Sequence, residues 1–322
     1  MQLDSKIYVA GHRGLVGSAL MRQLAAKGYR NLITRTHAEL DLTNQAAVSA
    51  FFTKEKPEYV FLAAARVGGV VANHTYPAEF IYSNLAIQTN VIHESWEVGV
   101  KRLLFLGSSC IYPRECPQPI KEEYLLTGPL ETTNRPYAIA KIAGVEMCHA
   151  YNRQYGTKFL AAMPTNLYGP NDSYDLQNSH VLPALIRKMH EAKLRKDHEV
   201  VVWGTGTPRR EFLYSEDMAD ACVFLMNIGD EKYTSLLSAR SFPLINIGCG
   251  EDLSIRELAE VVKDTVGFDG KLSFDTSKPD GTPRKWLDVG LLSQLGWRAR
   301  TRLNEGIAQA YTDYLNRVGS VA

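Results

Sequence analysis

A glycine loop near the N-terminus constrains the fold more than any other segment of the chain. Gly11, Gly14 and Gly17 directly follow an apolar run at residues 6–10 and open a helical pattern at residues 15–27. A loop between a strand and a helix lets backbone N–H groups approach a pyrophosphate at the positive helix N-terminus. A tight strand–helix turn without a ligand is the alternative. Because strand, loop and helix follow in this order, we favour a dinucleotide-binding site.

The first half of the chain alternates short apolar runs with amphipathic helical stretches, as βαβ units do. We expect further strands at residues 31–35, 59–64, 100–106 and 159–163, and further helices at residues 44–54, 80–98 and 136–155. Right-handed crossovers would wind these strands into one parallel sheet with helices on both faces.

The pattern changes after residue 170, where polar residues precede a basic helix. Strands are expected at residues 200–203 and 244–247, and helices at 183–196, 217–226, 254–266 and 303–317. We therefore predict an α/β fold, with a doubly wound (Rossmann) parallel sheet and a smaller, discontinuous α/β substrate-binding domain. The expected boundaries are residues 1–170 with a return at about 212–248 for the Rossmann domain, and residues 171–211 and 249–322 for the second domain.

The charge balance and the cysteines exclude several classes of function. The chain carries 36 Lys and Arg against 35 Asp and Glu, a net charge of +1. This balance argues against binding to nucleic acid or to an anionic membrane, because a basic field supplies most of that affinity. Five widely spaced cysteines without a CxxC pair indicate neither a disulfide framework nor a metal cage. Without a targeting signal or an apolar stretch of about 20 residues, we expect a cytoplasmic protein.

The end of the second expected strand indicates which dinucleotide binds. NAD-binding proteins usually place an acid there for the ribose 2′-hydroxyl, whereas an arginine suits a 2′-phosphate. Arg35 stands in this segment, no acid occurs before Glu39, and Arg13 adds a second cation in the loop. The pattern favours NADP(H), although Arg35 as a solvated surface charge is the alternative. Asp41 and Leu42 are then expected beside the adenine.

A tyrosine and a lysine one helical turn apart indicate a proton-transfer site. Tyr137 and Lys141 share a helix face, and a neighbouring cation favours the phenolate and lowers the pKa of a tyrosine. The same lysine could hold the ribose of the cofactor. YxxxK occurs by chance on many helices, so the upstream loop and the strand ending at Ser108 provide the context. Ser108 could donate to a substrate carbonyl, while a turn hydroxyl bonded to backbone is an equal alternative for Ser109.

Taken together, the glycine loop, Ser108 and the Tyr137/Lys141 pair resemble the extended short-chain dehydrogenase/reductase family. Members of this family mostly act on nucleotide sugars, and GxxGxxG is the spacing of its loop. Further segments resemble the members that convert GDP-4-keto-6-deoxy-D-mannose to GDP-L-fucose. These segments are residues 63–69, 106–113, 136–144, 163–170, 178–180 and 278–285. The likeness runs from about residue 6 to the last helix.

The resemblance implies epimerisation at C3 and C5 of the sugar, followed by reduction at C4 with NADPH. Cys110 and His180 match the acid/base pair of the family, and unperturbed pKa values of about 8.5 and 6.5 suit proton exchange near neutrality. Which of the two removes the proton stays open. A small buried apolar role for Cys110 and a helix-capping or surface role for His180 are the alternatives. Tyr137 would protonate the C4 oxygen, assisted by Ser108 and Lys141.

The resemblance also implies two sets of binding residues. Those for the cofactor are Gly11, His12, Arg13, Gly14, Leu15, Val16, Gly17, Arg35, His37, Asp41, Leu42, Ala63, Ala64, Leu106, Gly107, Ser109, Lys141, Pro164, Thr165, Asn166, Leu167 and His180. Those for the substrate are Lys188, Trp203, Arg210 and Asp280. For Lys188 a solvated helix face is the alternative, and for Arg210 an ion pair with Glu211 at the domain seam. His37 departs from the family, which has an arginine there.

Other functions stay open at this stage. A dehydratase is disfavoured, because Ser109 and Cys110 stand where related dehydratases commonly carry acids. The alternatives are another nucleotide-sugar epimerase or reductase, for instance a GDP-colitose-type synthase, and a non-catalytic NADP-binding protein. The latter has no use for the Tyr137/Lys141 pair. By analogy with the family we expect a homodimer, in which the helices at 80–98 and 136–155 form a four-helix bundle with their mates.

Overall fold

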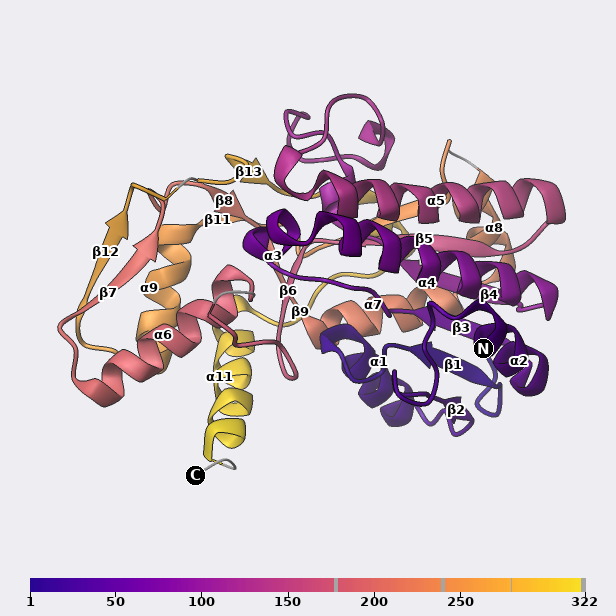
Figure 1. The fold of residues 1–322 in the computed structure, drawn as a ribbon, viewed down its shortest axis with the longest axis horizontal. Coiled ribbons are helices and arrows are strands. Elements are labelled where there is room, and N and C mark those ends of the chain that lie inside the picture. Colours follow the sequence, from indigo (N-terminus) through magenta and orange to yellow (C-terminus); the bar gives the residue numbers. More distant parts are fainter. Residues whose placement is uncertain (177–178, 239–240, 279, 320–322) are drawn as a thin grey trace.

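A parallel β-sheet organises the part of the molecule on the right of Figure 1. The computed structural model describes residues 1–176, 179–238, 241–278 and 280–319, and in these residues the sheet has six strands in the order β10-β5-β4-β3-β1-β2. Every neighbouring pair is parallel. The strands are β1 (Ile7–Ala10), β2 (Leu32–Ile33), β3 (Tyr59–Leu62), β4 (Arg102–Leu106), β5 (Phe159–Pro164) and β10 (Leu244–Ile247).

Helices cover both faces of this sheet, and two apolar cores fill the layers between (Figure 1). One core packs α1 (Leu15–Ala26), α7 (Ser215–Asn227), α8 (Asp230–Ser238) and α10 (Gly290–Leu295) against the sheet. The other packs α2 (Gln45–Glu55), α4 (Pro77–Glu97) and α5 (Arg135–Tyr155) against the opposite face. The strands read as continuous apolar runs because both of their faces are buried. The predicted doubly wound fold is confirmed.

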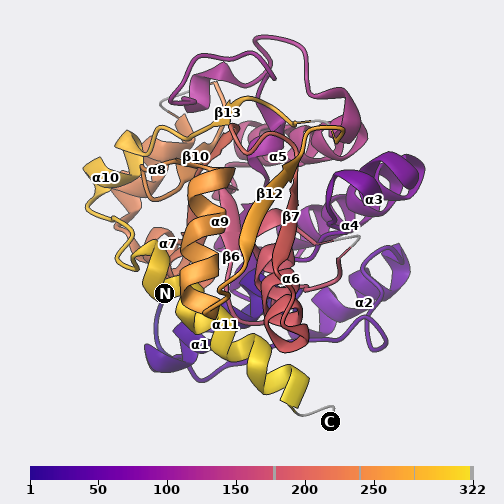
Figure 2. The ribbon, with the colours of Figure 1, turned by 90° about the vertical axis from the view of Figure 1, so that its left-hand side faces the viewer.

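A second part of the chain lies at the other end of the molecule and has its own core. Its helices are α6 (Val181–Arg195), α9 (Ile255–Val266) and α11 (Leu303–Gly319). In Figure 2 they lie around the parallel pair β7 (Glu199–Trp203) and β12 (Lys271–Asp275). A smaller sheet joins β8 (Arg209–Arg210) to β11 (Leu253–Ser254) and β13 (Arg284–Lys285). The expected boundaries of the two domains stay a prediction.

Short elements connect the two parts. β6 (Asn166–Tyr168) pairs with β9 (Phe212–Tyr214), so the chain that leaves β5 meets the chain that returns to α7. Further short helices are α3 (Val70–Thr75), η1 (Ser109–Ile111), η2 (Glu122–Tyr124) and η3 (Thr132–Asn134). Across the described ranges, no helix combines the length and the apolar character that crossing a membrane requires.

A buried carboxylate holds the seam between the two parts. Glu211 has no exposed surface, and its side chain accepts N–H bonds from Gly250 at 2.7 Å and from Leu287 at 3.0 Å. Its backbone carbonyl accepts from Thr165 Oγ1 at 3.1 Å and from Asn166 Nδ2 at 2.8 Å. The expected alternative, an ion pair between the side chains of residues 210 and 211, is not among the ion pairs of the described residues.

Replacing Glu211 by alanine should therefore destabilise the whole chain. The substitution leaves the buried N–H group of Leu287 and the part-buried N–H group of Gly250 without acceptors, and each such group costs about 1–3 kcal/mol. We expect the free energy of unfolding to fall by about 2–4 kcal/mol in urea titrations followed by circular dichroism. Glu260→Ala, at an exposed position of α9, is the matched control and should stay within about 0.5 kcal/mol. Equal urea midpoints for the two variants would contradict a stabilising role of the Glu211 carboxylate.

Candidate active site

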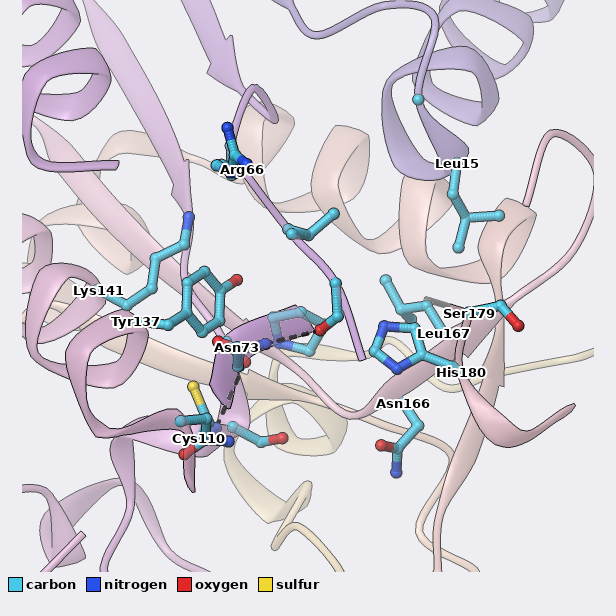
Figure 3. A pocket seen from close by; sticks show the side chains of 18 of the residues that line it. Leu15, Arg66, Asn73, Cys110, Tyr137, Lys141, Asn166, Leu167, Ser179 and His180 are labelled. Atoms are coloured by element: carbon cyan, nitrogen blue, oxygen red, sulfur yellow. Dashed lines mark hydrogen bonds between the residues drawn. The ribbon is translucent and has the colours of Figure 1, made fainter. Parts of the chain in front are cut away.

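A cavity of about 1450 Å³ opens where the carboxyl ends of the sheet strands meet the second part of the chain. Residues that follow β1, β3, β4 and β5 line one side of it, and residues of α6, β7 and β8 line the other. Doubly wound folds bind their ligands at this edge of the sheet. Figure 3 shows part of the cavity from close by.

The glycine loop presents backbone to this cavity. Gly14 is the N-cap of α1 and donates its N–H to the Gly11 carbonyl at 3.0 Å, and no side chain caps the helix. Gly11 has φ = +84°, and a Cβ there would lie 2.7 Å from the backbone nitrogen of Ala64. A Cβ on Gly17 would overlap the Gly11 carbonyl oxygen. The loop therefore leaves a side-chain-free cradle at a helix N-terminus, which is the form of an anion site.

Tyr137, Lys141 and Ser108 lie together at the end of β4. Lys141 is buried, donates from Nζ to the carbonyl of Leu106 at 2.7 Å, and lies 5.8 Å from the centre of the Tyr137 ring. Ser108 and Tyr137 both line the cavity here. The helical turn that separates residues 137 and 141 places both side chains on one face of α5, and Figure 3 shows them next to each other.

Burial has a larger effect than the lysine on the pKa of Tyr137. Burial raises the pKa of Tyr137, the nearby Cys110 raises this pKa further, and the Ser108 hydroxyl opposes both. Burial also lowers the pKa of Lys141 to about 8. The pKa of Tyr137 is thus raised and not lowered as expected, because burial outweighs the influence of the Lys141 ammonium, which bonds the Leu106 carbonyl. Tyr137 is held as a neutral phenol, the form that donates a proton.

Cys110 and His180 face the same cavity from two different elements. Cys110 lies in η1, beside Tyr137, and His180 is the N-cap of α6 on the other side of the view in Figure 3. Burial raises the pKa of the Cys110 thiol, opposed by the positive charge of Lys285 and a bond with Ser108. Burial lowers the pKa of His180, and Lys285 lowers it further. The imidazole is nonetheless open to the cavity that it lines, which leaves it free to exchange a proton.

Most residues expected to bind the cofactor line the cavity; His12 and Arg13 do not, and Arg13 is exposed on the surface. Arg35 lines it but is not a solvated charge. Its guanidinium contacts Glu55 at 2.7 Å and the Thr34 carbonyl at 2.7 Å. His37 points into solvent, with its side chain 85% exposed. An anion beside Arg35 would therefore compete with the Glu55 carboxylate.

The residues expected to bind the substrate lie in the far half of the cavity. Trp203 is 54% exposed, with the ammonium of Lys188 4.9 Å and that of Lys278 5.7 Å from its ring centre. Burial lowers the pKa of Lys188, so the alternative of a fully solvated helix face does not describe it. Asp280 accepts from the backbone N–H of Thr205 at 3.0 Å and from its hydroxyl at 2.7 Å.

The cavity is also lined by residues for which we predicted no role. Arg66 and Lys285 fall inside segments that carry the family resemblance, and Asn73 belongs to the unpredicted helix α3. Asn73 is buried and donates to the carbonyls of residues 68 and 69 at 2.8 and 3.0 Å. The resemblance also included Asn178 and Pro279, which lie outside the described residues.

Comparison with known proteins identifies the family. The sequence model of the NAD dependent epimerase/dehydratase family matches residues 7–236. The chain belongs to this family. This match and the relatives described next confirm the resemblance expected from the glycine loop, Ser108 and the Tyr137/Lys141 pair.

Curated relatives in this family match the chain over almost its full length. GDP-L-fucose synthase 1 of Arabidopsis thaliana is 59% identical over 98% of this chain and 94% of its own. GDP-L-fucose synthase of Escherichia coli is 51% identical over 96% of each chain. Among solved structures, a GDP-L-fucose synthetase from Naegleria fowleri bound to NADP has a TM-score of 0.87 and 28% identity, and the match covers 99% of this chain and 97% of that one.

Two glycines of the family's loop should respond very differently to alanine. At Gly17 a Cβ meets fixed backbone, with the carbonyl carbon of Gly11 at 2.6 Å. Gly17→Ala should therefore lower the free energy of unfolding by about 3 kcal/mol, as overpacking does. Gly14→Ala is the matched control, since its Cβ has only the Gly11 oxygen at 3.5 Å and its φ is −76°. Urea titrations should show that this variant loses less than about 1 kcal/mol of its free energy of unfolding. A larger loss than in Gly17→Ala would contradict the close backbone packing described for this loop.

Proposed function

We propose that this chain converts GDP-4-keto-6-deoxy-D-mannose to GDP-L-fucose by epimerisation at C3 and C5 and reduction at C4 with NADPH. The observation that carries the proposal is that two kinds of proton-transfer groups line one cavity. Cys110 and His180 suit epimerisation, and Tyr137 with Lys141 suits reduction. Relatives named GDP-L-fucose synthase, at 51–59% identity over nearly the full length, support the same substrate.

Epimerisation requires a base and an acid around one ring. Protons on carbons beside the C4 ketone are acidic, because the electron pair of the broken C–H bond moves onto the carbonyl oxygen. A proton returned to the opposite face inverts that carbon. We assign the pair to Cys110 and His180, which reach the cavity from η1 and from the start of α6. The Ser108 hydroxyl is the donor that we assign to the enolate oxygen.

Reduction then uses the neutral phenol of Tyr137. Because burial raises its pKa, Tyr137 keeps its proton until negative charge develops on the C4 oxygen. NADPH supplies the hydride when bound. Lys141 keeps the phenol in place from the next turn of α5, and its ammonium favours the phenolate that remains. The side-chain-free glycine cradle at α1 fits the pyrophosphate of this cofactor, and we assign its N–H groups to it.

The GDP end of the substrate fits the far half of the cavity. We assign Lys188 and Arg210 to the phosphates, because cations on the cavity wall offset that charge and arginine binds phosphate bidentately. Trp203 is exposed enough to stack on a base or a sugar. Asp280 is held by Thr205 and is assigned to the polar edge of the nucleotide or of the sugar.

We also propose a homodimer and a cytoplasmic location. Exposed apolar side chains on α4 and α5, namely Tyr82, Ile139 and Tyr155, support pairing of these helices with those of a second copy. All five cysteines are free, as is usual in reducing compartments.

Replacement of Arg35 tests the preference for NADPH. A charge-assisted bond to the 2′-phosphate is absent with NADH, so Arg35→Ala should raise the KM for NADPH about tenfold and leave that for NADH within about twofold. Initial rates with each cofactor measure this difference. Arg30→Ala, an exposed arginine at the other end of β2, is the control and should change neither constant. Equal losses with both cofactors would contradict the assignment of Arg35.

Reaction in D₂O separates the two chemical steps. With GDP-4-keto-6-deoxy-D-mannose and NADPH, the wild-type chain should oxidise NADPH and incorporate deuterium at C3 and C5. Tyr137→Phe should lose NADPH oxidation by about 100-fold and keep the exchange, because only reduction needs the phenol. Cys110→Ser should lose the exchange by a similar factor and keep the affinity for NADPH.

Absorbance at 340 nm and NMR of the sugar provide the two readouts. If the wild-type chain does not oxidise NADPH with this substrate, the proposed function is wrong. Faster turnover of a related GDP-linked keto sugar would instead support the colitose-type alternative.

A further inference from the structure

Two neighbouring strands direct their four cations to opposite faces. β13 runs parallel to β8, with Arg284 opposite Arg209 and Lys285 opposite Arg210. Arg209 and Arg284 share Asp252, with Nε–Oδ distances of 3.2 and 2.5 Å. Because successive side chains of a strand point to opposite faces, Arg210 and Lys285 project the other way, and both line the active-site cavity.

Lys285 is a cation without a bound counter-ion. In the part of the chain that the structure describes, no carboxylate lies within ion-pair distance of its ammonium. The charged and titratable groups near it are Cys110, Cys116, Glu131, His180 and Arg210. Of these, Glu131 is already engaged: its carboxylate accepts from Thr133 and lies 3.5 Å from Arg114.

An ammonium group without a paired carboxylate, such as that of Lys285, is unfavourable unless its charge has a function in the site. Burial lowers the pKa of Lys285, the direction that desolvation imposes on any amine. An unpaired cation is held in a partly desolvated place at a cost in free energy. Groups of this kind concentrate at functional sites, where negative charge develops during a reaction.

The position of Lys285 shows which groups its charge reaches. It lines the main cavity together with Cys110 and His180, and it also lines a small cavity of about 40 Å³ that touches Cys110. Its charge is the largest influence that opposes the burial of the Cys110 thiol, ahead of Ser108 and Lys141. It also disfavours protonation of the His180 ring. One cation therefore acts on both members of the assigned acid/base pair.

We propose that Lys285 is a positioning residue of the epimerisation centre, whose ammonium stabilises the thiolate of Cys110 during proton transfer to and from the sugar. This inference rests on the proposed function. If Cys110 removes the proton, the thiolate precedes the transfer, and the C–H electron pair moves onto the C4 oxygen. If Cys110 delivers the proton, that pair returns to carbon and the thiolate follows. The same charge assists in either direction, and Lys285 itself transfers no proton.

Alkylation of Cys110 tests this without substrate. Only the thiolate reacts with iodoacetamide, so the rate against pH reports its population. In Lys285→Met we expect the alkylation rate of Cys110 at pH 7.5 to fall at least tenfold. The midpoint of the alkylation rate against pH should move up by about one pH unit. Lys285→Arg keeps the charge and should stay within about threefold of the wild-type rate. Peptide mass spectrometry separates Cys110 from the partly exposed Cys116 and Cys249.

A second lysine in the same cavity provides the control. Lys278→Met removes an equal charge beside Trp203, and it should leave the alkylation profile of Cys110 unchanged. Lys285→Met removes a cation without leaving a partner uncompensated, so we expect it to fold, with the circular dichroism of the wild-type chain. An alkylation profile in Lys285→Met that matches the wild-type profile would overturn the proposal.

Isotope exchange then tests the role in catalysis. Lys285→Met should lower deuterium incorporation at C3 and C5 at least tenfold, with the Kd values for NADPH and GDP within about twofold. A tenfold loss of GDP affinity with unchanged exchange would instead make Lys285 a phosphate ligand and overturn the proposal. Failure of the proposed function is recognised separately, because the wild-type chain would then not oxidise NADPH. The alkylation result does not depend on that reaction.

Discussion

The buried hydrogen bond from Lys141 Nζ to the carbonyl of Leu106 determines where the chemistry of this site lies. It fixes α5 to the carboxyl end of β4, and the preceding helical turn then places Tyr137 next to Ser108. A second buried bond, from Gln88 Nε2 to the Ala140 carbonyl at 2.6 Å, fixes α5 to α4. Inside a packed layer such bonds are expensive to break, because the freed polar groups find no water. The phenol is therefore held in place before any ligand arrives.

The parallel sheet brings the remaining groups to the same place. All of its strands end at one edge, so segments more than 100 residues apart in the sequence, such as the loop at Gly11 and the segment after Pro164, face one cavity. The second part of the chain covers this edge with α6, β8 and β13, each of which contributes a cationic or titratable side chain. Glu211 holds the seam between the two parts through backbone N–H groups. The cavity therefore depends on all three cores and on the seam.

Much of this arrangement is visible in the sequence, and the parts that are not have identifiable causes. The six sheet strands could be predicted because they are short, mostly apolar runs, although the expected strand at residues 31–35 is only Leu32–Ile33. The helix expected at residues 254–266 coincides with α9, where Ser254 forms a capping box with Glu257. The helix α8 could not be predicted, because only Tyr233 and Leu236 of its nine residues are buried. Two apolar positions are too few to show a helical periodicity. In the site, residue types and motifs identify the functional side chains, but they do not show which residues these side chains contact. That Arg35 contacts Glu55, and that the Lys141 ammonium is turned to a carbonyl, are results of packing between distant segments.

Burial has one effect on every titratable group at the centre of the site. It is the largest cause of the raised pKa values of Tyr137 and Cys110 and of the lowered pKa values of Lys141, His180 and Lys285. Each shift favours the uncharged form, so the site resists charge in its resting state. A charge that does form there is poorly screened, and a neighbouring charge or donor then has more influence on it than it would in water. The groups that oppose burial are Ser108 for the phenol, and Lys285, Ser108 and Lys141 for the thiol. Epimerisation and reduction can share one cavity because the lysine charges favour the thiolate of Cys110, whereas burial keeps the proton on the phenol of Tyr137.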